Sequence, residues 1–98
     1  MVGKMTCFVC GAPAVELHHI LVPQYKRYGD WVHAPCNMAP VCKQCHIGSG
    51  EAKSYVTRMR WIETQDKDEL LAWLDAAPYE ARYRVAEVRR MVNGNGQD

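Results

Sequence analysis

Two Cys-x-x-Cys pairs, Cys7 with Cys10 and Cys42 with Cys45, constrain the fold of this chain more than any other feature. Thiolates three residues apart both reach one ion from a tight turn, and two such turns supply the four tetrahedral ligands of a structural zinc. The alternatives are four reduced cysteines that only fill space, or redox chemistry at a single pair. Two pairs of equal spacing favour the metal, so we expect Zn²⁺ bound by all four thiolates.

A chain of 98 residues has room for one domain with a small core, in which a bound ion supplies a large share of the folding free energy. We expect a single domain over residues 1–98, with a Cys/His metal core over 1–50 and a helical extension over 51–98. The fifth cysteine, Cys36, fits a small buried apolar residue better than a ligand. No stretch approaches the roughly 20 apolar residues of a membrane span, and residues 1–7 lack the apolar segment of a secretion signal. We therefore expect an intracellular, cytoplasmic protein with no membrane contact.

The hydrophobic pattern changes from strand-like to helix-like near Gly50. Branched aliphatic residues predict a strand over 15–22, ended by Pro23, and then a loop over 24–36 with a short strand around 31–33. Asp66 and Glu69 are spaced as the capping box of a helix that continues to Ala77. A helix before it is predicted from apolar residues at helical spacing, which are Ala52, Tyr55, Val56, Met59 and Ile62.

A last helix is predicted after Pro78, which suits the first position of a helix. Its buried stripe would consist of Ala81, Val85, Val88 and Val92. The expected fold class is therefore α+β, with a small zinc-stabilised core followed by two or three packing helices.

All four histidines, His18, His19, His33 and His46, lie in the first half of the chain. His18 and His19 lie between the cysteine pairs and His46 follows Cys45, so a metal bound by the cysteines would draw these three into one region. Three histidines held close together by one metal site favour a functional site over separate structural roles. His33 lies in the predicted loop, where a surface role is favoured over contact with substrate or metal.

These residues together resemble the HNH nuclease family, whose pattern is a (Asp/His)-His-Ile strand, a loop, an Asn, and a Cys-x-x-Cys-His segment. The resemblance covers residues 7–46, and residues 51–98 carry no part of it. It implies a ββα-metal, treble-clef-like core, and the family is frequent in bacteria, phages and mobile elements. The matching residues are Cys7-x-x-Cys10, Glu16-Leu17-His18-His19-Ile20 with Pro23, and Asn37-Met38-Ala39-Pro40-Val41-Cys42-x-x-Cys45-His46.

The resemblance implies a metal-dependent endonuclease that hydrolyses phosphodiester bonds in DNA. His19 would be the general base that activates water, and a neutral imidazole near pH 7 suits that task. His18 and His46 would hold a single divalent ion, Mg²⁺, Mn²⁺, Ni²⁺ or Zn²⁺, which stabilises the phosphate and the leaving oxygen. Asn37 would orient the loop, and so His19, or assist at the metal. Adjacent strand residues point to opposite faces. The sequence therefore leaves open which of His18 and His19 is the base and which is the metal ligand.

Net charge gives little support for binding nucleic acid through the whole surface, because the 12 basic residues are nearly balanced by 11 acidic ones, for a net charge of +1. Contact with DNA, or with RNA, would need local patches. Lys26 and Arg27, flanked by Tyr25 and Tyr28, form one candidate. Lys53, Thr57 and Arg60 would share the polar face of the first helix and form another. Residues 51–98 could also bind a protein partner, and the sequence gives no oligomeric state.

Two alternatives to the nuclease remain. A non-catalytic zinc module that binds nucleic acid or protein would keep the four cysteines, but it would not need His18, His19, Asn37 and His46 together. A thiol-based redox sensor would release zinc when Cys7 and Cys10 are oxidised. The joint presence of the histidines and the asparagine favours the enzyme.

Overall fold

The computed structural model describes residues 5–94. Two short strands, β1 (Glu16–His19) and β2 (Met38–Val41), pair antiparallel, with Glu16 opposite Val41 and His19 opposite Met38. Three α-helices follow within these residues: α1 (Tyr55–Thr64), α2 (Lys67–Asp75) and α3 (Arg82–Val92). The fold is a small α+β one, as the sequence predicts.

Strand β1 is shorter than the predicted span of 15–22. The chain leaves the sheet after His19, although Ile20, Leu21 and Val22 are buried. The side-chain oxygen of Asn37 accepts hydrogen bonds from the backbone N–H groups of Leu21 and Val22. These two residues therefore satisfy their backbone donors without a neighbouring strand.

The predicted short strand around residues 31–33 is wrong, because Lys26–His33 forms two 3₁₀ turns. The turns meet at Gly29, whose positive φ of 64° breaks any extended run. Trp31 and Trp73 then fix the second turn. Their rings stack 4.2 Å apart, and each indole N–H donates to the backbone carbonyl of the other residue, at 2.7 and 2.8 Å. Loop 26–33 is thereby joined to α2.

Helix α1 starts late, and the predicted apolar stripe is buried only in part: Ala52 is buried, and Met59 and Ile62 are partly buried. A π-helical turn (Gln44–Gly48) and a 3₁₀ turn (Glu51–Lys53) precede it, and the Ser54 side chain caps its first turn. Tyr55 and Val56, predicted to be buried, are 55% and 65% exposed, whereas Thr57 and Trp61 are buried. The indole of Trp61 donates to the carbonyl of Cys36, which turns this face of the helix inward.

Helices α2 and α3 follow the prediction closely. Asp66 caps α2 by accepting a hydrogen bond from the backbone N–H of Glu69. This is one of the two hydrogen bonds of the predicted capping box. A 3₁₀ turn, Tyr79–Ala81, leads from Pro78 into α3. The stripe predicted for α3 is buried or partly buried and packs with the main core.

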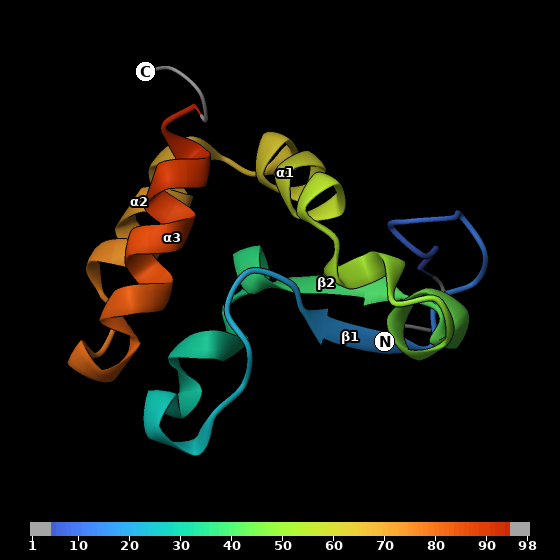
Figure 1. The fold of residues 1–98 in the computed structure, drawn as a ribbon, viewed down its shortest axis with the longest axis horizontal. Helices are drawn as coiled ribbons and strands as arrows, with labels where there is room; N and C mark the ends of the chain where they lie inside the picture. Colours follow the sequence, from blue (N-terminus) through green and yellow to red (C-terminus); the bar gives the residue numbers. More distant parts are fainter. Residues whose placement is uncertain (1–4, 95–98) are drawn as a thin grey trace.

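The main core contains residues from both halves of the chain, including Leu21 and Val32 with Leu70, Leu74 and Val88. A smaller cluster of Cys7, Val41, Cys45 and Ala52 lies at the cysteine end of the sheet. Figure 1 shows α2 and α3 side by side at one end of the molecule, the two strands at the other, and α1 between them. Across residues 5–94, each helix is too short or too polar to cross a membrane.

Candidate functional site

The four paired cysteines come together at one end of the sheet. Cys7 and Cys10 lie in a turn closed by the hydrogen bond from Gly11 N to Cys7 O, and Cys42 follows β2 directly. The four Sγ atoms all lie within 4.8 Å of one another, and those of Cys10 and Cys42 are 3.6 Å apart. Tetrahedral Zn–S bonds of about 2.3 Å place the sulfur atoms about 3.8 Å apart. The cluster could therefore hold a metal ion such as zinc.

The surroundings shift the pKa of Cys7 inside the cluster and of Cys36 outside it in opposite directions. Burial acts to raise the pKa of Cys7, but backbone hydrogen bonds from Cys10, Cys42 and Val9 outweigh it and bring the pKa down to about 6. Cys36 lies outside the cluster and packs against the main core, where burial raises its pKa to about 11. This position agrees with the expected role of Cys36 as a small apolar residue.

His18 and His46 face each other on the same side of the sheet, with ring centroids 4.6 Å apart. His18 comes from β1, and His46 comes from the π-helical turn that follows β2. Burial lowers the pKa of His18 to about 4, assisted by the charges of His46 and Lys53. Its imidazole is thus neutral near pH 7, the state in which histidine binds a metal ion.

Glu16 orients His46, a role that the sequence analysis missed. Its Oε1 lies 2.6 Å from Nδ1 of His46, so Nδ1 donates to the carboxylate and Nε2 is the ring atom left to face a metal ion. Glu16 and His18 are two residues apart on β1 and therefore point to the same face. That spacing was the signal available in the sequence.

His19 lies on the other side of β1 and meets His33. The Nε2 atom of His19 is 3.0 Å from Nδ1 of His33. Burial lowers the pKa of His19, and the charges of His33 and His46 act in the same direction. The sequence analysis favoured a surface role for His33, and its side chain is exposed, but the contact with His19 was not predicted. Its contact depends on the fold of loop 26–33, for which the sequence offered no signal.

Asn37 is fully buried, and its amide makes four hydrogen bonds to the backbone. Oδ1 accepts from Leu21 N and Val22 N at 2.8 and 2.9 Å, and Nδ2 donates to Val22 O and Val32 O at 2.9 and 2.8 Å. The amide thus ties the segment after β1 to loop 26–33. Asn37 contacts neither histidine ring through these bonds, so it can act only by holding the two segments that carry His19 and His33.

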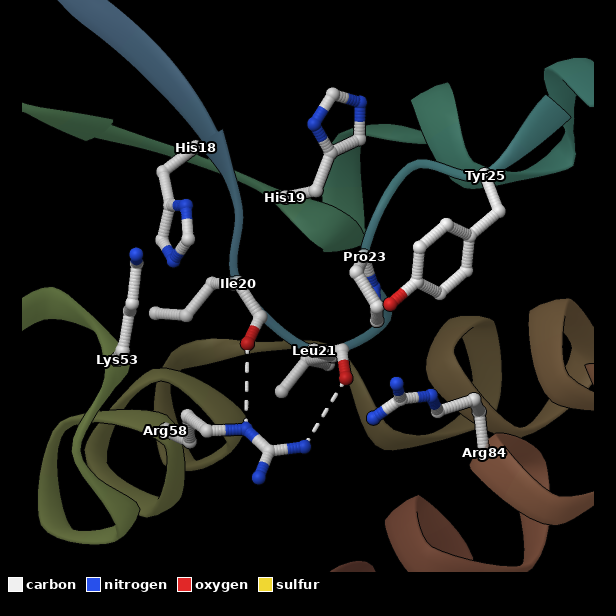
Figure 2. A pocket seen from close by; sticks show the side chains of 9 residues that line it. All are labelled: His18, His19, Ile20, Leu21, Pro23, Tyr25, Lys53, Arg58 and Arg84. Carbon is white, nitrogen blue, oxygen red and sulfur yellow. Dashed lines mark hydrogen bonds between the residues drawn. The ribbon is translucent and has the colours of Figure 1, made fainter. Parts of the chain in front are cut away.

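A pocket of about 360 Å³ lies beside the end of β1. Figure 2 shows His18 and His19 on either side of the strand, Lys53 near His18, and Arg84 near Tyr25. Because β1 ends at His19, both histidines line this one pocket. Its complete lining contains no acidic residue and consists of His18, His19, Ile20, Leu21, Pro23, Tyr25, Lys53, Arg58 and Arg84.

The predicted nucleic-acid contacts separate into two groups. Lys53 lines the pocket, while Lys26 lines an adjacent hollow with Tyr25 and His33. Arg27 lies over the rings of Tyr25 and Tyr28, at 4.8 and 5.2 Å from their centroids.

Arg60 lies over Phe8 and is not among the residues that line the pocket. Thr57 is buried, so the predicted face of Lys53, Thr57 and Arg60 is wrong. Arg58 and Arg84, which the sequence analysis did not select, line the pocket instead. Trp61 and Arg58 set the rotation of α1, and this removes Thr57 from the surface.

No protein-family model, curated protein or solved structure matches this chain.

Proposed function

We propose that this protein is a metal-dependent endonuclease of the HNH type that hydrolyses phosphodiester bonds in DNA. The observation that carries the proposal is the pairing of His18 with His46 beside a cationic pocket that His19 also lines. A site that cuts a phosphodiester needs a metal position, a base and positive charge, and in this proposal the three histidines and the cationic pocket would supply them.

The catalytic ion would be held by His18 and His46, with Glu16 orienting His46. Two imidazole ligands suit Mn²⁺, Ni²⁺ or Zn²⁺, and Mg²⁺ remains compatible when phosphate and water oxygens complete its shell. When bound, a divalent ion supplies charge that stabilises the phosphate and the leaving oxygen. The role of Glu16 is to keep Nε2 of His46 available, through the 2.6 Å contact at Nδ1.

His19 would be the general base, and His33 would set its tautomer. The contact between Nε2 of His19 and Nδ1 of His33 needs one donor and one acceptor. When His19 donates from Nε2, its Nδ1 carries the lone pair. Nδ1 then takes a proton from water, the water oxygen bonds to phosphorus, and the P–O3′ bond breaks. The released 3′ oxygen takes a proton from solvent, so the products are a 5′ phosphate and a 3′ alcohol.

The four-cysteine cluster would hold a structural Zn²⁺ in a treble-clef-like core. His46 directly follows Cys45, and β2 runs directly into Cys42. An ion bound by these thiolates would therefore fix the turn that carries His46 relative to the sheet that carries His18. Asn37 would be a positioning residue, because all its hydrogen bonds described above reach backbone groups.

The test is cleavage of supercoiled plasmid by zinc-loaded protein, with added Mg²⁺, Mn²⁺ or Ni²⁺ or with EDTA. We expect metal-dependent nicking that falls by about 10²-fold or more in His19→Ala, the scale of a lost general base. His18→Ala should also lose metal-dependent nicking, because His18 would be a ligand of the catalytic ion. Lys67→Ala, which changes an exposed residue of α2, should cut like the wild type. Zinc content and circular dichroism must remain unchanged in each variant.

Failure of folded, zinc-loaded wild type to cut with any of these ions would refute the proposal. The alternative, a non-catalytic zinc module that binds nucleic acid or protein, would then take its place. Cutting that survives His19→Ala and His18→Ala would refute the assignment of the site, and a contaminating nuclease would then have to be sought.

A further inference from the structure

The pocket beside β1 carries more positive charge than one scissile phosphate requires. Three cationic side chains line it, Lys53, Arg58 and Arg84, and none of its lining residues is acidic. Figure 2 shows Lys53 at the His18 end and Arg84 at the opposite end, close to Tyr25. The volume of about 360 Å³ is that of a site for a small ligand or a short stretch of polymer.

Arg58 is already used by the fold. Its Nε donates to the carbonyl of Ile20 at 3.2 Å, and its Nη2 donates to that of Leu21 at 3.0 Å. Its Nη1 lies 3.4 Å from the carboxylate of Glu87, with which it forms an ion pair. The charge of Arg58 therefore holds α1 against the segment after β1 and is partly neutralised by α3.

Lys53 and Arg84 are in a different position. Among residues 5–94, neither forms an ion pair with a carboxylate. The guanidinium of Arg84 lies 5.8 Å from the ring centroid of Tyr25, which supports it from the side. Burial acts to lower the pKa of Arg84, but the hydroxyl of Tyr28 and the charge of Glu87 outweigh it and raise that pKa, which keeps Arg84 charged. Since neither cation has a carboxylate of the described residues at ion-pair distance, both can attract an anionic ligand that enters the hollow.

We propose that Lys53 and Arg84 each bind a DNA backbone phosphate that flanks the one that is cut, one at either end of the pocket. The proposal rests on the proposed nuclease function for the identity of the strand, but its binding step can be tested without cleavage. Arg84 is suited to such a contact because its planar fork binds two phosphate oxygens at once, whereas Lys53 acts as a point charge. In this arrangement the helical extension contributes directly to substrate binding.

The test measures binding of a fluorescein-labelled 20-base-pair duplex by fluorescence anisotropy between 50 and 200 mM salt. His19→Ala serves as the background so that the duplex stays intact. Each phosphate contact contributes about 0.9 to the slope of log K against log salt, which is about eightfold in affinity at 0.1 M. We expect Arg84→Gln and Lys53→Gln each to lower the slope by about 1 and the affinity roughly eightfold.

Arg90→Gln is the matched control, because it removes the same charge from an exposed position of α3 that does not line the pocket. The inference is overturned if Arg84→Gln and Lys53→Gln bind with the affinity and slope of Arg90→Gln, or if the background protein does not bind the duplex. Should Arg84→Gln fail to fold by circular dichroism, Lys53→Gln decides, because the Lys53 side chain is exposed.

The two proposals fail separately. Protein that binds through Lys53 and Arg84 but does not cut would refute the nuclease and keep the phosphate contacts. Protein that cuts plasmid at the wild-type rate, with unchanged binding after both substitutions, would keep the nuclease and refute the phosphate contacts.

Discussion

Replacing Asn37 tests how much of the site depends on one buried amide. Asn37→Ala removes the partner of four backbone groups, two N–H and two C=O, in a part of the structure closed to solvent. Each such hydrogen bond contributes about 1 kcal/mol, so the four together correspond to about 4 kcal/mol. A chain of this length has about 5–15 kcal/mol of total stability, at 0.05–0.15 kcal/mol per residue. The substitution therefore removes a quarter or more of it.

Asn37→Asp separates hydrogen bonding from packing, because it keeps the volume of the side chain. One carboxylate oxygen can still accept from Leu21 and Val22, but the other would face the carbonyls of Val22 and Val32, where Nδ2 donates in the wild type. Two acceptors cannot bond to each other. We therefore expect Asn37→Asp to be destabilising on the same scale as Asn37→Ala.

The measurement is urea unfolding followed by tryptophan fluorescence, at a fixed concentration of zinc. Asn93→Ala, which truncates an exposed asparagine at the end of α3, should stay within about 0.5 kcal/mol of the wild type. A loss below about 1 kcal/mol in Asn37→Ala would refute the reasoning from hydrogen bonds. An Asn37→Asp variant as stable as the wild type would show that the two hydrogen bonds donated by Nδ2 contribute little.

Three further predictions concern the metal cluster, His18 and α2. Removing a bound zinc with a chelator should lower the Tm by roughly 20 °C, since an ion at a thousandfold its Kd adds about 4 kcal/mol; an unchanged thermal melt would argue against a structural ion at Cys10 and its partners. The pKa of His18 is about 4 in the folded chain against an ordinary 6.5, so the unfolded chain binds this proton first. The stability that the neutral ring allows is thus present above pH 6.5 and lost as the pH falls towards 4. In urea unfolding over that range, the free energy of unfolding of His18→Asn should decline less steeply than that of the wild type; equal declines would contradict the assigned burial. Finally, Asp66→Ala should cost about 1 kcal/mol in the same assay through the lost cap, and a change near zero would mean that the first turn of α2 is held by packing alone.

The features that could be predicted from the sequence are those encoded by short-range spacing. Each cysteine pair is set by one tight turn, and the two pairs, 32 positions apart, were joined only through the chemistry of zinc, which needs four ligands. The cap at Asp66 needed only residues within one helical turn. The stripe of α3 is equally local, because its apolar residues recur every three or four positions. Each of these patterns places its partners without knowledge of the rest of the fold.

The features that failed depend on partners far along the chain. The face that α1 buries is chosen by Trp61, which bonds to the carbonyl of Cys36, and by Arg58, which reaches Ile20 and Leu21. A pattern that scores only apolarity selects Tyr55 and Val56 instead, and both are exposed.

The contact of His19 with His33 has the same origin. It exists only because loop 26–33 folds into 3₁₀ turns rather than a strand. Neither histidine has a spacing that identifies the other. The sequence thus named His18, His19 and His46, but it named neither their contacts nor Arg58 and Arg84, which line the pocket with His18 and His19.

The reciprocal bonds between Trp31 and Trp73 set an order for folding during synthesis. All four paired cysteines have been synthesised once Cys45 is added. Loop 26–33 cannot complete its hydrogen bonds until Trp73 follows, 28 positions later. A chain emerging from the ribosome can therefore bring its thiols together while this loop is still unanchored. Loop 26–33 is thus anchored after the paired cysteines have left the ribosome.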